Sequence, residues 1–127
     1  MKILKNLFPL FLLFFSLQNC AQNDPSKTLT VKEFKERINN NDSTMVILDV
    51  RTDEEVKGTL PKIDGAVHIP IQELEERFNE LEKFKNKEIV IVCRTQNRSS
   101  KAAEFLSKKG YNAKSVTGGM QEYYKDN

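Results

Sequence analysis

One cysteine of this chain stands where a nucleophile would be useful, at the end of a short apolar run. Residues 89–92, Ile-Val-Ile-Val, are β-branched and typical of a strand buried on both faces of a parallel sheet. Cys93 follows directly, and a helical apolar pattern begins at Ser99. In open parallel sheets, ligands bind beyond the carboxyl ends of the strands, where the next helix presents free N–H groups. We therefore expect residues 94–97 to form a tight anion-binding loop with the thiol of Cys93 at its floor.

The chemistry of such a site depends on the ionised thiol. A thiolate is the nucleophilic form of cysteine, and the pKa of a thiol falls beside cations and at helix N-termini. The loop offers both, because it carries Arg94 and Arg98 and a helix is expected to follow. A guanidinium offers forked donors to an oxyanion, so we expect Arg94 to point outward toward a substrate. Ser99 is placed to cap the helix and to add a hydroxyl donor.

Four motifs, in order along the chain, resemble those of the rhodanese family of sulfurtransferases. The run from Cys93 to Ser99, C-R-T-Q-N-R-S, resembles the family's six-residue active loop, which is commonly C-R-x-G-x-R-S. Residues 47–55, I-L-D-V-R-T-D-E-E, resemble its L-D-V-R-x-x-x-E stretch, and residues 65–70, G-A-V-H-I-P, resemble G-A-x-x-I-P. The Gly-Gly turn within residues 116–120 is similar to the one before the family's last helix.

The resemblance implies a three-layer α/β domain, in which helices flank a central parallel sheet, and it implies sulfur transfer. Cys93 would attack the outer sulfane sulfur of a donor such as thiosulfate or polysulfide and become a persulfide. A thiol or cyanide would then accept the sulfur, and no metal or organic cofactor is required. The family pattern gives Arg98 the role of structuring the loop and adding positive potential. The other residues of the implied substrate-binding loop are Arg94, Thr95, Gln96, Asn97 and Ser99.

Gln96 departs from the family pattern, because many active members have glycine at this position. Glycine accepts a positive φ that glutamine adopts only at a cost of about 1 kcal/mol. We therefore expect a reshaped or strained loop. This departure supports a second hypothesis, a catalytically silent module that binds a partner or senses oxidants through Cys93.

Loop length bears on a third hypothesis, a cysteine phosphatase or arsenate reductase. Those enzymes resemble C-x5-R, whereas Cys93 to Arg98 is C-x4-R. The shorter loop makes a narrower ring of amides, which suits a sulfur atom better than a tetrahedral phosphate. A lone cysteine after a strand is also commonly a small buried hydrophobe, which is the alternative to any of these activities.

Three more polar residues in the motifs are interpreted as structural. We expect Asp49 and Arg51 to form hydrogen bonds or an ion pair beneath the loop. His68 precedes an Ile-Pro pair, and a thiolate of lowered pKa needs no general base. His68 is therefore left out of the predicted site.

Strand and helix patterns alternate along the rest of the chain. Thr30 and Glu33 predict a capping box at the start of a helix. The predicted strands are residues 45–50, 67–69, 89–92 and 113–116. The predicted helices cover residues 31–38, an amphipathic stripe over 71–81, a segment from Ser99 that Gly110 caps, and a short tyrosine-bearing segment after Gly118 and Gly119.

The first residues have the composition of an export signal. Lys2 and Lys5 give a basic start, and residues 7–17 form an apolar run too short to span a bilayer as a helix. The run ends in Leu17-Gln18-Asn19-Cys20, which resembles a relaxed bacterial lipobox whose cysteine becomes the lipidated first residue. We predict a lipoprotein-type signal peptide over residues 1–19, a tether over 20–27 and a rhodanese-like domain over 28–127. Plain secretion and an uncleaved anchor are the alternatives.

Cleavage at this site would leave a lipid-anchored, periplasm-facing protein in a bacterial cell envelope. It removes two lysines and no acidic residue, so the formal charge of +2 becomes 0, and nucleic-acid binding has no electrostatic support. The remaining 108 residues (127 − 19) suffice for one domain. With Cys20 lipidated, Cys93 is the only free thiol, so no intramolecular disulfide can form. The expected partners are a small sulfur-donor anion, a thiol acceptor and the membrane, and the sequence indicates no oligomeric state.

Overall fold

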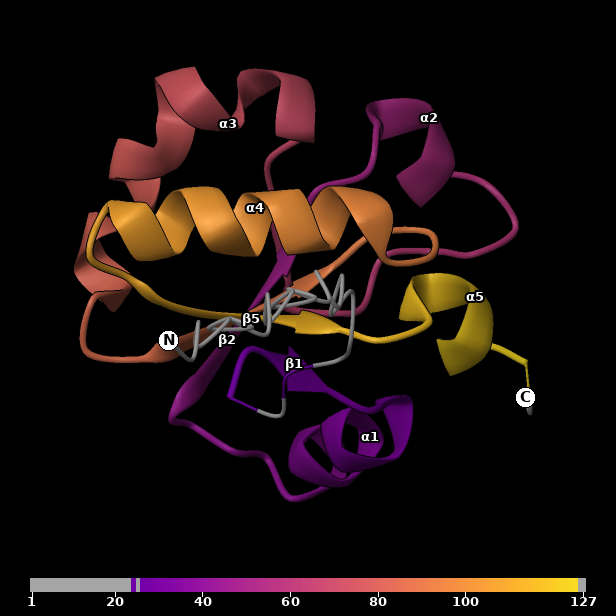
Figure 1. The fold of residues 1–127 in the computed structure, drawn as a ribbon. Helices are drawn as coiled ribbons and strands as arrows, with labels where there is room; N and C mark the ends of the chain where they lie inside the picture. The colour runs from indigo at the N-terminus through magenta and orange to yellow at the C-terminus, as the bar shows by residue number, and fades with distance from the viewer. Residues whose placement is uncertain (1–23, 25, 126–127) are drawn as a thin grey trace, which may run out of the picture.

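A parallel sheet lies between two layers of helices in the computed structural model, which describes residues 24 and 26–125 (Figure 1). The strand order is β1-β5-β4-β2-β3, and each neighbouring pair is parallel. The strands are β1 Thr28–Leu29, β2 Met45–Asp49, β3 Val67–His68, β4 Glu88–Val92 and β5 Asn112–Val116. The helices are α1 Val31–Asn39, α2 Asp53–Val56, α3 Ile71–Arg77, the 3-10 helix η1 Phe78–Phe84, α4 Asn97–Lys108 and α5 Gly119–Tyr123. The predicted three-layer α/β fold with a central parallel sheet is confirmed.

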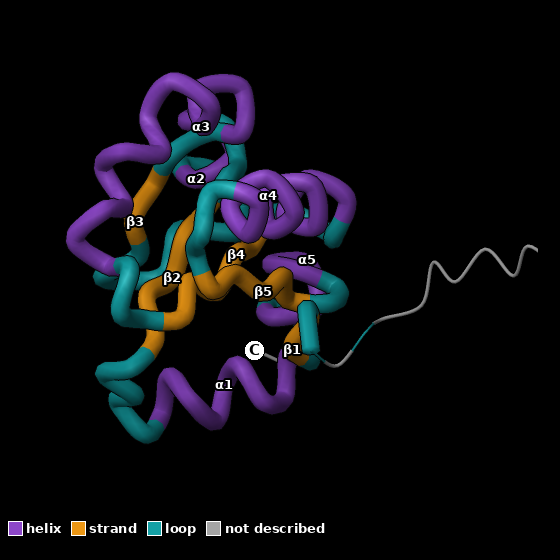
Figure 2. The backbone as a smooth tube through the Cα atoms, turned by 60° about the vertical axis from the view of Figure 1, so that its left-hand side comes forward, coloured by secondary structure: helices purple, strands orange, loops and turns teal. Residues whose placement is uncertain are grey.

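Two apolar cores lie on the two faces of the sheet. Figure 2 shows helices on both sides of its strands. Helices α3, η1 and α4 cover one face, and α1 and α5 cover the other. Strand β4 lies at the centre and supplies both cores, because Ile89 and Ile91 pack on the α4 side while Val90 and Val92 pack on the α1 side. The prediction of a strand buried on both faces is confirmed. The same alternation directs Cys93 to the α4 side, where it packs in the core.

Side-chain caps begin two of the helices. Thr30 and Glu33 form the predicted capping box of α1. Thr52 and Glu55 form a second capping box, at the start of α2, which the sequence analysis did not predict. The T-x-x-E signature is present, but a four-residue helix is too short to show an apolar period.

Two predicted helix boundaries are wrong. Helix α4 begins at Asn97 rather than Ser99, because the carbonyl of Gln96 already accepts a hydrogen bond from the N–H of Ser100 at 2.9 Å. The apolar stripe over residues 71–81 divides into α3 and the tighter η1, although it still buries Leu74 and Leu81. The predicted end of α4 is confirmed, because Gly110 adopts a φ of 90° directly after the C-cap Lys109.

The end of the predicted tether lies on the sheet. Lys27 and Asp24 form a turn, and the carbonyl of Lys27 accepts a hydrogen bond from the N–H of Ser115 at 3.0 Å. The predicted signal peptide, Cys20 and residues 21–23 lie outside the described residues. Within the part that is described, no helix is both long enough and apolar enough to cross a membrane.

Candidate active site

Cys93 lies at the carboxyl end of the central strand, beneath the loop that leads to α4. Its side chain is 1% exposed. The thiol donates a hydrogen bond to the hydroxyl of Ser99 at 3.5 Å, and that hydroxyl donates to the carbonyl of Gln96 at 3.0 Å. Ser99 is fully buried inside α4, so the prediction that it caps this helix is wrong. Its hydroxyl instead connects the thiol to the loop backbone.

Backbone N–H groups of helix α5 bind the carbonyl groups at the start of the loop that follows Cys93. The N–H of Met120 donates to the carbonyl of Cys93, and the N–H of Gln121 donates to the carbonyl of Arg94, both at 2.9 Å. The peptide bonds of the described residues are trans, so the N–H that follows each carbonyl points the opposite way. The N–H groups of Arg94 and Thr95 are therefore directed away from α5.

These two N–H groups are available to a ligand. Among the described residues, neither Arg94 nor Thr95 donates a backbone hydrogen bond. The first turn of α4 adds further N–H groups, because the first N–H groups of a helix have no partner within it. Free N–H groups of a loop and of a helix N-terminus together form an anion-binding site.

Gly119 permits the close contact between α5 and the loop. A Cβ added at this position would lie 2.2 Å from the carbonyl oxygen of Thr95, 2.5 Å from that of Cys93 and 2.8 Å from that of Arg94. The φ of Gly119 is also positive, at 57°. From the sequence, the Gly-Gly pair was interpreted as a break before the last helix. The one signal of a contact with the site was its place in the family resemblance.

Arg98 connects the loop to α2. Its guanidinium binds the carboxylate of Glu55 through two hydrogen bonds, of 2.5 and 2.8 Å. The hydrogen bond from Arg98 lowers the pKa of Glu55 to about 2, and the hydrogen bond to Glu55 raises the pKa of Arg98. The structure thus gives Arg98 a contact that can hold the loop in shape, but Glu55 compensates much of the positive potential expected from this residue.

The other loop side chains lie at or near the surface. Arg94, Thr95 and Asn97 are exposed, and Gln96 is half-buried. Within the described chain the guanidinium of Arg94 makes no hydrogen bond or ion pair, so its charge remains available to an anion. Gln96 has a φ of −152°, so the predicted strain at this position is wrong. The reason is that α4 starts early, which makes Gln96 an N-cap rather than a left-handed turn residue.

A buried ion pair lies at the carboxyl end of the neighbouring strand β2. Arg51 binds Asp49 at 2.7 Å, and both side chains are 1% exposed. Arg51 also donates to the carbonyl of Leu60 at 2.6 Å, and its own carbonyl lies 2.7 Å from Nε2 of His68. The predicted structural roles of Asp49, Arg51 and His68 agree with these contacts. Loss of one partner of such a buried pair leaves an uncompensated charge and costs about 3–5 kcal/mol.

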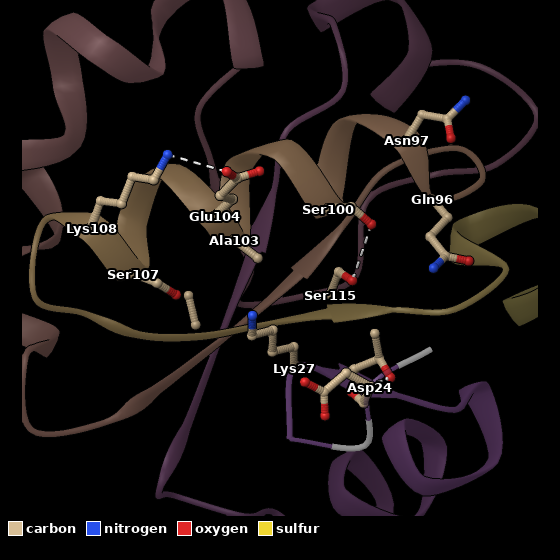
Figure 3. Close-up of a pocket in the computed structure, with 12 residues that line it drawn as sticks. Asp24, Lys27, Gln96, Asn97, Ser100, Ala103, Glu104, Ser107, Lys108 and Ser115 are labelled. Carbon is tan, nitrogen blue, oxygen red and sulfur yellow. Dashed lines mark hydrogen bonds and ion pairs between the residues drawn. The ribbon is translucent and has the colours of Figure 1, made fainter. Parts of the chain in front are cut away.

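A groove of about 860 Å³ runs along α4 from the loop (Figure 3). Gln96 and Asn97 lie at its loop end, and Lys108 lies toward the other end of the helix. Cys93 is not one of the residues that line it, so this groove is separate from the thiol. Across residues 24 and 26–125, no group of three or more His, Cys, Asp or Glu side chains is arranged to hold a metal ion.

The chain belongs to the rhodanese-like domain family, whose model matches residues 30–126. It is 35% identical over 98 residues to YtwF of Bacillus subtilis (strain 168), which is named as a sulfurtransferase, and the match covers 76% of this chain and 89% of YtwF. YrkF of the same organism, named as a sulfur carrier protein, is 38% identical over 96 residues, and the match spans 75% of this chain and 49% of YrkF. The crystal structure of a rhodanese-related protein from Thermoplasma volcanium is similar, with a TM-score of 0.69, 32% identity, and coverage of 80% of this chain and 93% of that one.

Replacement of Gly119 by alanine should destabilise the protein more than the same change at Gly110. Both glycines have a positive φ, but a Cβ at Gly110 meets nothing within 4 Å. We expect Gly119→Ala to lower the free energy of unfolding by about 3 kcal/mol, since it combines backbone strain with overpacking, and Gly110→Ala to lower it by about 1 kcal/mol. Urea denaturation measures both, and equal losses would contradict the close contact at Gly119.

Replacement of Glu55 by glutamine should have a pH-dependent effect on stability. The pKa of Glu55 in the folded protein, about 2, lies below its usual value of 4.5, so the ionised form favours folding. This contribution is complete well above pH 4.5 and is lost as the pH falls from 4.5 toward 2. We expect Glu55→Gln to cost on the order of 1–2 kcal/mol at pH 7, allowing for solvent screening, and to cost almost nothing near pH 2. Denaturant titrations across this range measure the difference, and a cost that stays constant with pH would count against the ion pair.

Proposed function

We propose that this protein is a sulfurtransferase in which Cys93 carries a sulfane sulfur, as a persulfide, from a small donor to a thiol or cyanide acceptor. The observation that carries the proposal is the thiol beneath a loop whose carbonyls are bound by α5 and whose N–H groups at Arg94 and Thr95 make no hydrogen bond within the described part of the chain. Preorganised N–H donors stabilise negative charge on a reacting atom. The sulfurtransferase and sulfur-carrier names of relatives at 35–38% identity support the same chemistry.

The first step forms the persulfide. The thiolate of Cys93 attacks the outer sulfur of a donor such as thiosulfate, the S–S bond of the donor breaks, and sulfite leaves with the electron pair of that bond. In the second step an acceptor thiolate attacks the outer sulfur of the persulfide and leaves as a new persulfide, which regenerates the thiolate of Cys93. In both steps negative charge develops on Sγ of Cys93 or on the outer sulfur bound to it, so the same N–H groups can stabilise both steps.

Two side chains assist in this mechanism. The hydroxyl of Ser99 accepts a hydrogen bond from the thiol at 3.5 Å, and once the thiol is ionised the hydroxyl can rotate to donate a hydrogen bond to the thiolate. Arg94 is exposed, and its forked donors suit the oxygens of a thiosulfate ion.

A silent binding or oxidant-sensing module is the second candidate function. Its supporting observation is the 1% exposure of Cys93, which requires that a donor enter through the loop. A phosphatase or arsenate reductase is less compatible with the site, because Arg98, the loop arginine that would bind the oxyanion, is occupied by Glu55.

Membrane attachment is a separate part of the proposal. The lipobox-like run before Cys20 supports a lipid anchor and a periplasm-facing position in a bacterial envelope. We expect Cys20→Ala to release the protein from the membrane fraction of cells. Continued fractionation with membranes would favour an uncleaved N-terminal anchor instead.

The persulfide is tested by intact mass spectrometry of the full-length chain in mild detergent, with Cys20→Ala so that Cys93 is the sole thiol. Incubation with thiosulfate or polysulfide should add one sulfur atom, about 32 Da, and cyanide should remove it. The matched control, Cys93→Ser in the same background, should gain nothing. No gain with either donor would contradict sulfur transfer and favour the silent module.

A further inference from the structure

The two arginines of the loop that follows Cys93 differ in their partners. Arg98 is matched by Glu55 through two hydrogen bonds. The guanidinium of Arg94 has no partner among the described residues. Of these two loop arginines, Arg94 therefore presents the uncompensated charge.

Arg98 lies in the first turn of α4, directly before Ser99, whose hydroxyl accepts a hydrogen bond from the thiol of Cys93 at 3.5 Å. The hydrogen bonds to Glu55 and the nearby negative charges raise the pKa of Arg98. Glu55 holds it most firmly, since it supplies both hydrogen bonds. Without Glu55, the second loop arginine would add a full positive charge to the site.

The charge of the donor decides how strongly the positive charge of Arg98 would affect the reaction. Repulsion scales with the product of the charges, so a dianion meets twice the repulsion from the thiolate that a monoanion meets at the same distance. Thiosulfate carries two negative charges, whereas an organic hydropersulfide, R–S–S–H, is neutral at the reacting group or carries one. A site with one free cation suits the second kind of donor better.

We propose that Glu55 is a specificity-determining residue, which by occupying Arg98 makes the Cys93 site prefer organic hydropersulfides to thiosulfate. This inference rests on the proposed sulfurtransferase function. In the preferred reaction the thiolate of Cys93 attacks the terminal sulfur of R–S–S–H. The S–S bond of the donor breaks, R–S⁻ leaves with its electron pair, and Cys93–S–S–H forms, so atoms and charge balance without an oxidant or reductant.

The test compares two donors with the full-length Cys20→Ala chain in mild detergent. Rates of persulfide formation on Cys93 are measured by intact mass with thiosulfate and with cysteine hydropersulfide. Glu55→Gln should raise the thiosulfate rate by about tenfold and change the hydropersulfide rate by less than about threefold, because the freed charge of Arg98 attracts the dianion more strongly. The gain should shrink between about 0.05 and 0.5 M salt.

Glu54→Gln is the matched control, because Glu54 is an exposed glutamate on the same short helix and the change removes the same charge. It should leave the ratio of the two rates within about twofold of wild type, and Glu55→Asp, which keeps the carboxylate, should stay near wild type as well. A purely structural role for Glu55 would slow both donors together in Glu55→Gln and leave their ratio unchanged, and that result would overturn the inference.

Arg94→Gln provides an independent measurement if Glu55→Gln does not fold. Arg94 is exposed, and its loss should slow thiosulfate by more than about tenfold but hydropersulfide much less, because Arg98 cannot take its place. An equal loss for both donors would overturn the inference alone. Absence of persulfide in the unsubstituted Cys20→Ala chain with every donor would instead overturn the proposed function as well.

Discussion

The hydrogen bonds from the first N–H groups of α5 to the loop carbonyls are the contacts on which the site depends. The N–H groups of Met120 and Gln121 donate to the carbonyls of Cys93 and Arg94. Because each trans peptide bond is planar, the N–H that follows each carbonyl, that of Arg94 or Thr95, points away from α5. Only glycine at position 119 lets the two backbones approach this closely. A loop of otherwise polar, exposed residues thereby acquires a defined orientation without side-chain packing of its own.

The sheet supplies the second constraint, which is the position of the thiol. Cys93 continues the alternation of Ile89 and Ile91 on the α4 face, so it lies in the core while the residue that follows it lies at the surface. The thiol is thus held by apolar packing beneath a loop whose N–H groups at Arg94 and Thr95 point away from α5. Low polarity around fixed donors strengthens their interaction with a sulfur anion.

The elements that could be predicted from the sequence are those whose signal is local. The β-branched run of β4, the capping box of Thr30 and the helix end at Gly110 each follow from neighbouring residues. The pairing of Arg98 with Glu55 joins residues 43 positions apart, so no local pattern could predict it. The strain expected at Gln96 was wrong because its backbone conformation depends on where α4 begins. The helix begins there without a side-chain cap, so no local signal marks its start.

A crystal structure of the chain after reaction with cysteine hydropersulfide would test most directly whether the loop is a cradle for sulfur. The account predicts one additional sulfur atom bonded to Sγ of Cys93, within about 3.5 Å of the backbone nitrogens of Arg94 and Thr95, with α5 still bound to the loop carbonyls. An unmodified thiol, or an outer sulfur turned away from these N–H groups, would contradict it.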